Sequence, residues 1–260
     1  ALFLCKKYKQ RTKRGIMITF IIKNSYLGIL SAVFFAYENK VFPNDISTEK
    51  HQLSFTEKVY EIPENTIQSA RVDSKLKEIL YPSNYTKLKN AIRSNYVNKH
   101  LIIFNYIVKT INAKKDIYNN FAVKEIFDYY TMVSAIKLEV HRLLGFIRFE
   151  KTENGIYYAH FTPDCDVCEL ILPHFIRRFK SIPFILHDTK HNVIIGYNNG
   201  EYKVVKEKIP QMKITTDEIP KFFKRYCDTV FIKERKNLRC MNNFLPRRYQ
   251  TFMPEKNELL

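Results

Sequence analysis

Residues 145–161 read GFIRFEKTENGIYYAHF, and two predicted strands flank an Asn-Gly pair in this stretch. Asn-Gly between alternating apolar and polar residues is a strong signal for a β-hairpin turn. The alternation places Phe146 and Arg148 on one face of the first strand, with Ile147 and Phe149 on the other. We therefore expect the chain to turn back here and to form part of an antiparallel sheet.

The elements around this hairpin predict the fold class. Upstream, apolar residues recur at intervals of three and four from Val123 to Leu144, which predicts a helix that ends where HRLLGFIRF (residues 141–149) begins. Downstream, PFILHD, NVIIGY and EYKVV predict three strands, the last two joined through Asn-Asn-Gly at 198–200. A helix is expected over DVCELILPHFIRRF, kinked or divided at Pro173, and further helices after Pro210. The sequence therefore predicts an α+β fold with a mostly antiparallel sheet, packed helices, and helical N-terminal and C-terminal portions.

The N-terminal part predicts a strand at MITFIIK, starting at Met17, followed by a buried helix. Residues 41–66 are polar and contain two prolines, so we expect a long connection with at most one short helix. A mainly helical region should follow, with a break at Pro82. We treat residues 1–16 as a basic tail or an upstream extension, and expect residues 17–260 to form one domain.

The composition favours a polyanionic partner. The chain has 260 residues, with 43 Lys and Arg against 26 Asp and Glu, which gives a net charge of +17. Such a charge suits nucleic acid or an anionic membrane surface. The most apolar stretch, NSYLGILSAVFFAY, is shorter than the roughly 20 residues that span a bilayer, so no membrane segment is predicted. Five scattered cysteines, an odd number, suit a reducing cytoplasm.

Two stretches concentrate the positive charge. Residues 81–115 hold seven Lys or Arg, no acidic residue, and the interleaved Tyr85, Tyr96 and Tyr106. They could form a groove in which cations follow phosphates and aromatic rings meet bases, or a solvated helix face above core tyrosines. Residues 221–250 form a second basic stretch, rich in Arg, for which the same two interpretations stand.

Metal binding and catalysis have weaker signals. Cys165 and Cys168 form a C-x-x-C, but no second cysteine pair completes a closed set of four ligands. We therefore expect these cysteines to be structural, with no metal and no cofactor. A possible acid, base and phosphate clamp can be drawn from His174, Arg177, Arg178, His187 and Asp188. Their spacing does not require catalysis, so enzymatic activity is left open.

Several stretches carry a resemblance to a known family: YLGILSAVFFAYENK, EVHRLLGFIRF, PHFIRRF, PFILHD and IKERKNLRCMNNFLPRRYQ. On these motifs the chain resembles the bacterial family of probable DNA metabolism proteins, a domain of unknown function. Members are typically encoded beside a radical S-adenosylmethionine protein that is DNA repair-like, and some are fused to a uracil-DNA glycosylase-like domain. The resemblance implies a functional surface built from His141, Arg142, Arg148, His174, Arg178, Asp188, Arg235, Asn237, Arg248 and Tyr249.

The resemblance implies a DNA-binding protein of bacterial DNA metabolism or repair, in the cytoplasm, acting with the radical S-adenosylmethionine protein or the glycosylase-like protein. Two alternatives stay open: an enzyme acting on DNA, such as a nuclease or a glycosylase-like activity, and an RNA-binding or protein-interaction module. We further expect Arg148, Arg235 and Arg248 to share one surface with His141, because a strand arginine among apolar residues needs a paired or solvated charge. Local pairing with Glu139, Glu150 or Glu234 is the alternative explanation for these arginines.

Overall fold

The computed structural model describes residues 17–49 and 57–207, and, near the C-terminus, residues 225, 229, 239, 245, 247–250 and 253. The chain divides into two compact units, Ala1–Ile136 and Lys137–Leu260, which we call the N-terminal unit and the C-terminal unit and describe separately. The expected tail and most of the expected C-terminal helical portion lie outside the described residues. One domain over residues 17–260 stays a prediction.

The N-terminal unit contains a three-stranded parallel sheet. Its strands are β1 (Met17–Ile21), β2 (Asp45–Ser47) and β3 (Glu57–Glu61), in the order β2-β1-β3. β1 pairs in parallel with both neighbours. The prediction of an irregular connection over residues 41–66 is therefore wrong. A three-residue strand such as β2 is too short to show the period of two by which strands are recognised.

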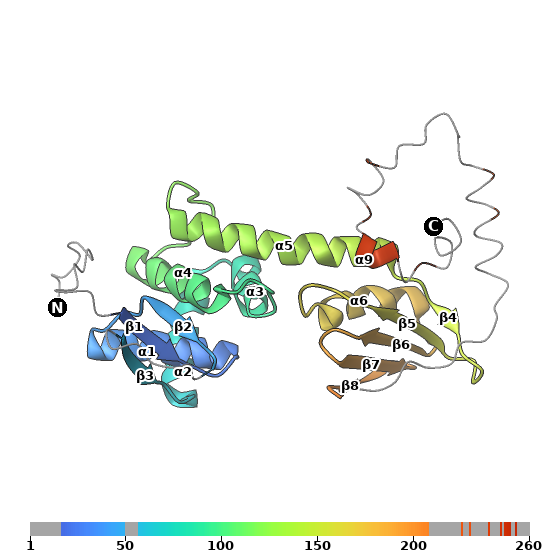
Figure 1. The fold of residues 1–260 in the computed structure, drawn as a ribbon, viewed down its shortest axis with the longest axis horizontal. Coiled ribbons are helices and arrows are strands. Elements are labelled where there is room, and N and C mark those ends of the chain that lie inside the picture. Colours follow the sequence, from blue (N-terminus) through green and yellow to red (C-terminus); the bar gives the residue numbers. More distant parts are fainter. Residues whose placement is uncertain are drawn as a thin grey trace. The chain divides into compact units, whose positions relative to one another are not determined.

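Helices pack around this sheet in the N-terminal unit (Figure 1). The structure has α1 (Tyr26–Asn39), α2 (Thr66–Ile79), α3 (Pro82–Ala91) and α4 (Lys99–Ala113). Side-chain oxygens of Ser25 and Asn65 accept hydrogen bonds from the first backbone amides of α1 and α2. Pro82 is the first residue of α3, where a missing N–H costs nothing, so the predicted break is confirmed.

Phe20 of β1 lies at the centre of the N-terminal core. Its side chain is fully buried, and its ring meets Phe35, Tyr60 and Phe104 edge-on, with ring centroids 5.5, 5.8 and 6.3 Å away. Edge-to-face pairs of this kind add about 0.5–1.5 kcal/mol each beyond the area that they bury. One strand residue thus joins α1, β3 and α4.

His100, in the first turn of α4, should make the stability of the N-terminal unit depend on pH. Its ring Nε2 lies 3.0 Å from Asn24 Oδ1, and burial, with a smaller contribution from Lys99, lowers its pKa to about 4. In the unfolded chain the pKa is about 6.5. Between these values the unfolded state binds the proton and the folded state does not. The contribution of His100 to the free energy of unfolding is therefore fully present above the unfolded pKa. About 2–3 kcal/mol of it is lost as the pH falls to about 4.

Urea denaturation from pH 8 to pH 4 checks this expectation when the parent protein is compared with a His100→Gln variant. Glutamine can still donate to Asn24 but does not titrate. The carboxylates titrate in both proteins, so their contribution cancels when the two free energies of unfolding are subtracted. A free-energy difference between the two proteins that stays constant with pH would contradict the assignment.

The C-terminal unit contains a five-stranded mixed sheet, and α6 (Cys168–Phe179) packs on one face of it (Figure 1). The strands lie in chain order: β4 (Glu150–Lys151), β5 (Tyr157–Phe161), β6 (Phe184–Asp188), β7 (Val193–Asn198) and β8 (Glu201–Val205). β5 and β6 pair in parallel because α6 (Cys168–Phe179) crosses between them. The other three pairings are antiparallel. The predicted α+β fold is confirmed.

Both predicted hairpin turns are present. Gly155 (φ 77°) follows Asn154, and its amide donates to the Thr152 carbonyl over 2.9 Å. At the β7–β8 turn, Asn199 (φ 45°) and Gly200 (φ 96°) both lie in the left-handed region. Asn and Gly adopt the left-handed conformation more easily than other residues, so the sequence predicts these turns.

The predicted strand GFIRFE is wrong except at its last residue, Glu150, where β4 begins. Helix α5 (Lys124–Phe146) extends six residues into the motif HRLLGFIRF, and residues 147–149 are irregular. The Ile147 amide still bonds to the Leu143 carbonyl over 3.0 Å, four residues back. Because these two apolar residues are spaced as in a helix, the helical period competes with the alternation and wins. Phe146 and Arg148 therefore do not share a strand face.

Aromatic residues fix α6 on the sheet. Phe149 contacts Phe175 and Phe179 of α6 at ring centroid distances of 5.1 and 4.6 Å, and Phe184 of β6 at 5.8 Å. Pro173 lies inside α6, which continues past it and is not divided. Among the described residues, no helix combines the length and apolar character needed to cross a membrane.

Candidate nucleic-acid interface

The outer face of α6 presents positive charge. His174, Arg177 and Arg178 are spaced three and four residues apart, so they are neighbours on the helix surface. Both arginines are exposed and His174 is half-buried, whereas Ile171 and Phe175 are buried against the sheet. The helix thus separates an apolar inner face from a cationic outer face.

Arg177 and Arg178 are not engaged by any other side chain in the part of the chain that the structure describes. Within the described ranges, neither Arg177 nor Arg178 has a hydrogen-bond or ion-pair partner. Carboxylates of the same unit are engaged elsewhere: Asp164 pairs with Lys190 over 3.1 Å, and Asp188 with His191 over 2.7 Å. As far as the described residues go, the guanidinium groups are therefore available to an external anion.

The helix dipole gives a partial structural reason for these cations. Positive side chains in a last helical turn stabilise the helix by about 0.3–1 kcal/mol, and Arg177 and Arg178 occupy that turn of α6. A single lysine would supply the same effect. The dipole does not account for two adjacent arginines, whose paired donors match phosphate oxygens.

The segment that follows α5 lies against the same helix. Phe149 packs on Phe175 and Phe179, so the preceding residue, Arg148, is one position away from a contact with α6. Arg148 is half-buried, and its Nη1 donates to the carbonyls of Gly145 (2.8 Å) and Ile147 (3.4 Å). The Arg148 guanidinium therefore uses part of its hydrogen-bonding capacity on backbone carbonyls at the C-terminal end of α5.

His141 and Arg142 lie on α5 rather than in its last turn. His141 is exposed and Arg142 is half-buried. The helix continues to Phe146, so these two cations do not lie at its C-terminal end. Within the described residues neither side chain has a polar partner.

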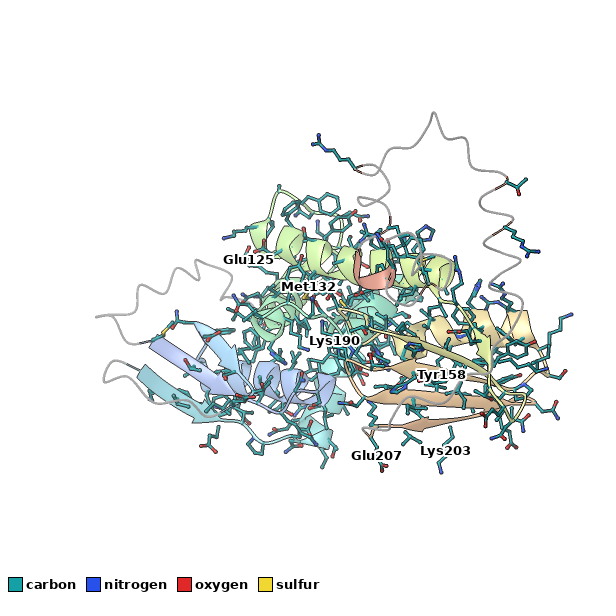
Figure 2. All side chains as sticks on the ribbon, turned by 45° about the vertical axis from the view of Figure 1, so that its right-hand side comes forward. Glu125, Met132, Tyr158, Lys190, Lys203 and Glu207 are labelled. Atoms are coloured by element: carbon teal, nitrogen blue, oxygen red, sulfur yellow. The ribbon has the colours of Figure 1, made fainter. Side chains whose placement is uncertain are left out.

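Asp188 lies in the interior, at the end of β6. Its side chain is fully buried, and Oδ1 accepts hydrogen bonds from the amides of Lys190 and His191, each over 3.0 Å. Its Oδ2 lies 2.7 Å from Nδ1 of His191, and this hydrogen bond raises the pKa of His191. Lys190, labelled in Figure 2, belongs to the same turn. His191 is absent from the residues predicted from the sequence, although Asp-x-x-His at the end of a strand is a usable signal.

His187, the other predicted acid or base, has a different partner. Its Nδ1 lies 2.7 Å from the hydroxyl of Tyr158, and the ring of Tyr158 stacks on His160 at 5.6 Å. Burial lowers the pKa of both histidines. The predicted combination of His187 with Asp188 therefore does not form, because successive residues of a strand point to opposite faces.

Tyr249 is buried in the C-terminal unit and not exposed to solvent. Its hydroxyl donates to Glu139 Oε1 over 2.8 Å, and its ring lies 5.6 Å from that of Phe146. It belongs to the short helix α9 (Arg247–Gln250), which lies beside α5 in Figure 1. Arg235, Asn237 and the side chain of Arg248 lie outside the described residues. Their shared surface with Arg148 and His141 stays a prediction.

The basic stretch at residues 81–115 is mostly structural. Lys87 Nζ lies 4.0 Å from the centre of the Tyr118 ring, and Lys99 Nζ donates to the carbonyls of Ile92 and Ser94. Tyr106 is fully buried. These contacts favour a helix face above core tyrosines over a phosphate-binding groove.

Cys165 and Cys168 are both free thiols and both buried. Burial raises the pKa of the Cys168 thiol, which opposes the thiolate form that binds metals. In the part of the chain that the structure describes, no group of three or more His, Cys, Asp or Glu residues is arranged to hold a metal ion.

Fold and surface together define an α+β protein with a cationic helix face in its C-terminal unit. The chain belongs to the family of a domain of unknown function, DUF4130, whose model matches residues 97–255, more than half of the chain. The match includes all of α6 and the five-stranded sheet. No curated protein matches the sequence.

Proposed function

We propose that the chain is a DNA-binding protein and that the outer face of α6 contacts the phosphate backbone. The observation that carries this proposal is the adjacent pair of exposed arginines, Arg177 and Arg178, without a partner in the described residues. The net charge of +17 supports a polyanionic ligand. The resemblance to bacterial probable DNA metabolism proteins supports DNA as that polyanion.

Neutralising both arginines is expected to weaken DNA binding and to reduce its salt dependence. Each phosphate contact contributes about 0.9 to the slope of log affinity against log salt concentration. An Arg177→Gln, Arg178→Gln double variant should therefore lower the slope by about 2 and the affinity by roughly tenfold per arginine near 0.1 M salt. Fluorescence anisotropy with labelled DNA over a salt series measures both quantities.

The matched control is Lys75→Gln, which removes an exposed charge from the N-terminal unit. Lys75 is already paired with Glu78 over 2.9 Å, so its loss should leave the affinity within a factor of two or so. If the parent bound DNA with an affinity independent of salt, phosphate contacts would be ruled out. Tighter binding of the parent to structured RNA would instead favour the RNA-binding alternative.

We also propose that the protein acts with a radical S-adenosylmethionine protein in DNA metabolism or repair. The resemblance supports this part of the proposal. Co-purification of the tagged chain with that enzyme from the native host tests it, and an Arg177→Gln, Arg178→Gln chain serves as a comparison. Loss of DNA binding with retained co-purification would separate the two interactions.

A further inference from the structure

Tyr202 is an exposed aromatic residue beside the cationic end of α6. Its side chain is 58% exposed on β8, the edge strand of the sheet. In the described residues it makes no hydrogen bond and no contact with another aromatic ring. The Tyr202 side chain, a large and rigid ring that is partly apolar, is therefore exposed to solvent.

Strand pairing places this ring on the same side of the sheet as α6. Tyr202 lies directly opposite Tyr197 of β7, and Tyr197 lies opposite Phe184 of β6. Phe184 contacts Phe179 of α6 at a ring centroid distance of 5.1 Å, so this face is the one that the helix covers. Paired residues point to the same face of a sheet. Tyr202 thus lies on the helix-covered face, one strand beyond Tyr197.

A hydrogen bond ties this position to the C-terminal end of α6. The Tyr197 hydroxyl donates to the carbonyl of Lys180, the residue that ends the helix, over 2.5 Å. Lys180 is exposed and follows Arg177 and Arg178. Cross-strand neighbours have Cβ atoms roughly 5 Å apart. The exposed ring of Tyr202 therefore borders the cations of the last turn of α6 and Lys180.

We propose that this surface, formed by Arg177, Arg178, Lys180 and Tyr202, binds single-stranded DNA, with a base stacked on the Tyr202 ring. This inference rests on the proposed DNA binding and specifies the form of DNA. Phosphates alone are available in duplex and single strand alike, but a base face is accessible to a side chain only when the base is unstacked. The juxtaposition of free cations and a free aromatic ring suits the single strand.

Lys203, the residue after Tyr202 in β8, lies on the opposite face of the sheet. Successive residues of β8 alternate, so Lys203 points away from α6, and Figure 2 shows it with Glu207 at the outer edge of the sheet. Tyr202 is thus presented with the α6 cations and not with Lys203. A DNA strand on this side meets one ring and three cations.

Fluorescence anisotropy tests the inference with two probes at one salt concentration: a labelled oligothymidylate of about 15 nucleotides and a duplex of the same length. The parent is expected to bind the single strand more tightly. Tyr202→Ala should lose about tenfold in affinity for the single strand and little for the duplex, because only the stacking contact is removed. Tyr202→Phe should retain the parent's affinity. Tyr81→Ala, which removes a tyrosine that is 69% exposed in the N-terminal unit, is the matched control and should have no effect.

The outcomes separate this inference from the proposed function. Salt-dependent binding that is equal for both probes, or stronger for the duplex, overturns the single-strand assignment and leaves DNA binding in place. An unchanged single-strand affinity of Tyr202→Ala overturns the stacking contact. A parent that binds neither probe overturns both proposals. A selective loss in Tyr202→Ala, restored in Tyr202→Phe, supports the inference.

Discussion

An Asp188→Ala variant is expected to be about 3–5 kcal/mol less stable than the parent, because it removes a fully buried carboxylate that accepts three hydrogen bonds. The Asp188 carboxylate is fully buried and accepts hydrogen bonds from two backbone amides and from the ring of His191. Alanine removes the acceptor of all three. Urea denaturation of the full chain, followed by a signal from the C-terminal unit, measures the loss.

An Asp188→Asn variant separates the charge of this residue from its shape. Its amide oxygen can still accept from the amides of Lys190 and His191, so most of the stability should remain. The hydrogen bond and charge that raise the pKa of His191 are lost, and the pKa should fall toward its ordinary value. Because the folded pKa of the parent is raised, this stabilisation is complete below about pH 6.5 and is lost as the pH rises through the folded value.

Nuclear magnetic resonance titration of the His191 ring measures this pKa in the parent and in the Asp188→Asn variant. Equal pKa values in the two proteins would show that Asp188 does not act on the imidazole. If Asp188→Ala were as stable as the parent, the turn after β6 would not depend on the carboxylate. The residue would then be available for another role.

The sequence predicted the second half of the fold well because its signals are local. Strands β5 to β8 are short, bounded by turn residues, and rich in β-branched and aromatic side chains. The Asn-Gly and Asn-Asn-Gly turns require left-handed backbone, which few other residues adopt. Such features do not depend on distant parts of the chain.

The errors arose where two local signals competed or where the deciding contact is distant. Residues 143–147 fit a helix and a strand equally well by their apolar spacing, and the hydrogen bond from Ile147 to Leu143 decides for the helix. The parallel pairing of β5 with β6 could have been predicted, because a helix separates them in the sequence. The sequence of β2 has no strand pattern of its own, because only the pairing with β1 makes this segment a strand.

The candidate surface was predicted in part. Arg178 and His174 lie on the outer face of α6 as exposed or half-buried cations. The family resemblance groups Asp188 and Tyr249 with them, yet both side chains are buried. Resemblance does not distinguish a residue that contacts a ligand from one that holds the fold. Tyr202 was missed because the alternation in EYKVV does not reveal which face carries the helix.

Glu139 is the buried hydrogen-bond partner of Tyr249, and its replacement is expected to cause the second large loss of stability. Its side chain is only 4% exposed on α5. Oε1 accepts hydrogen bonds from the Asp164 amide (2.7 Å) and the Tyr249 hydroxyl (2.8 Å), and Oε2 accepts from the Cys165 amide (2.8 Å). One carboxylate thus joins α5, the loop before α6, and α9.

A Glu139→Leu variant is expected to destabilise the C-terminal unit by about 3–5 kcal/mol, because two amides and a hydroxyl lose a buried, charged acceptor. Tyr249→Phe removes one of these donors and leaves the carboxylate with both amides, so it should cost only about 1 kcal/mol. Urea denaturation gives both values, and amide hydrogen exchange at Asp164 and Cys165 localises the change. Exchange at these amides should accelerate strongly in Glu139→Leu and little in Tyr249→Phe. Equal losses in the two variants would mean that the tyrosine, and not the carboxylate, holds these three segments together.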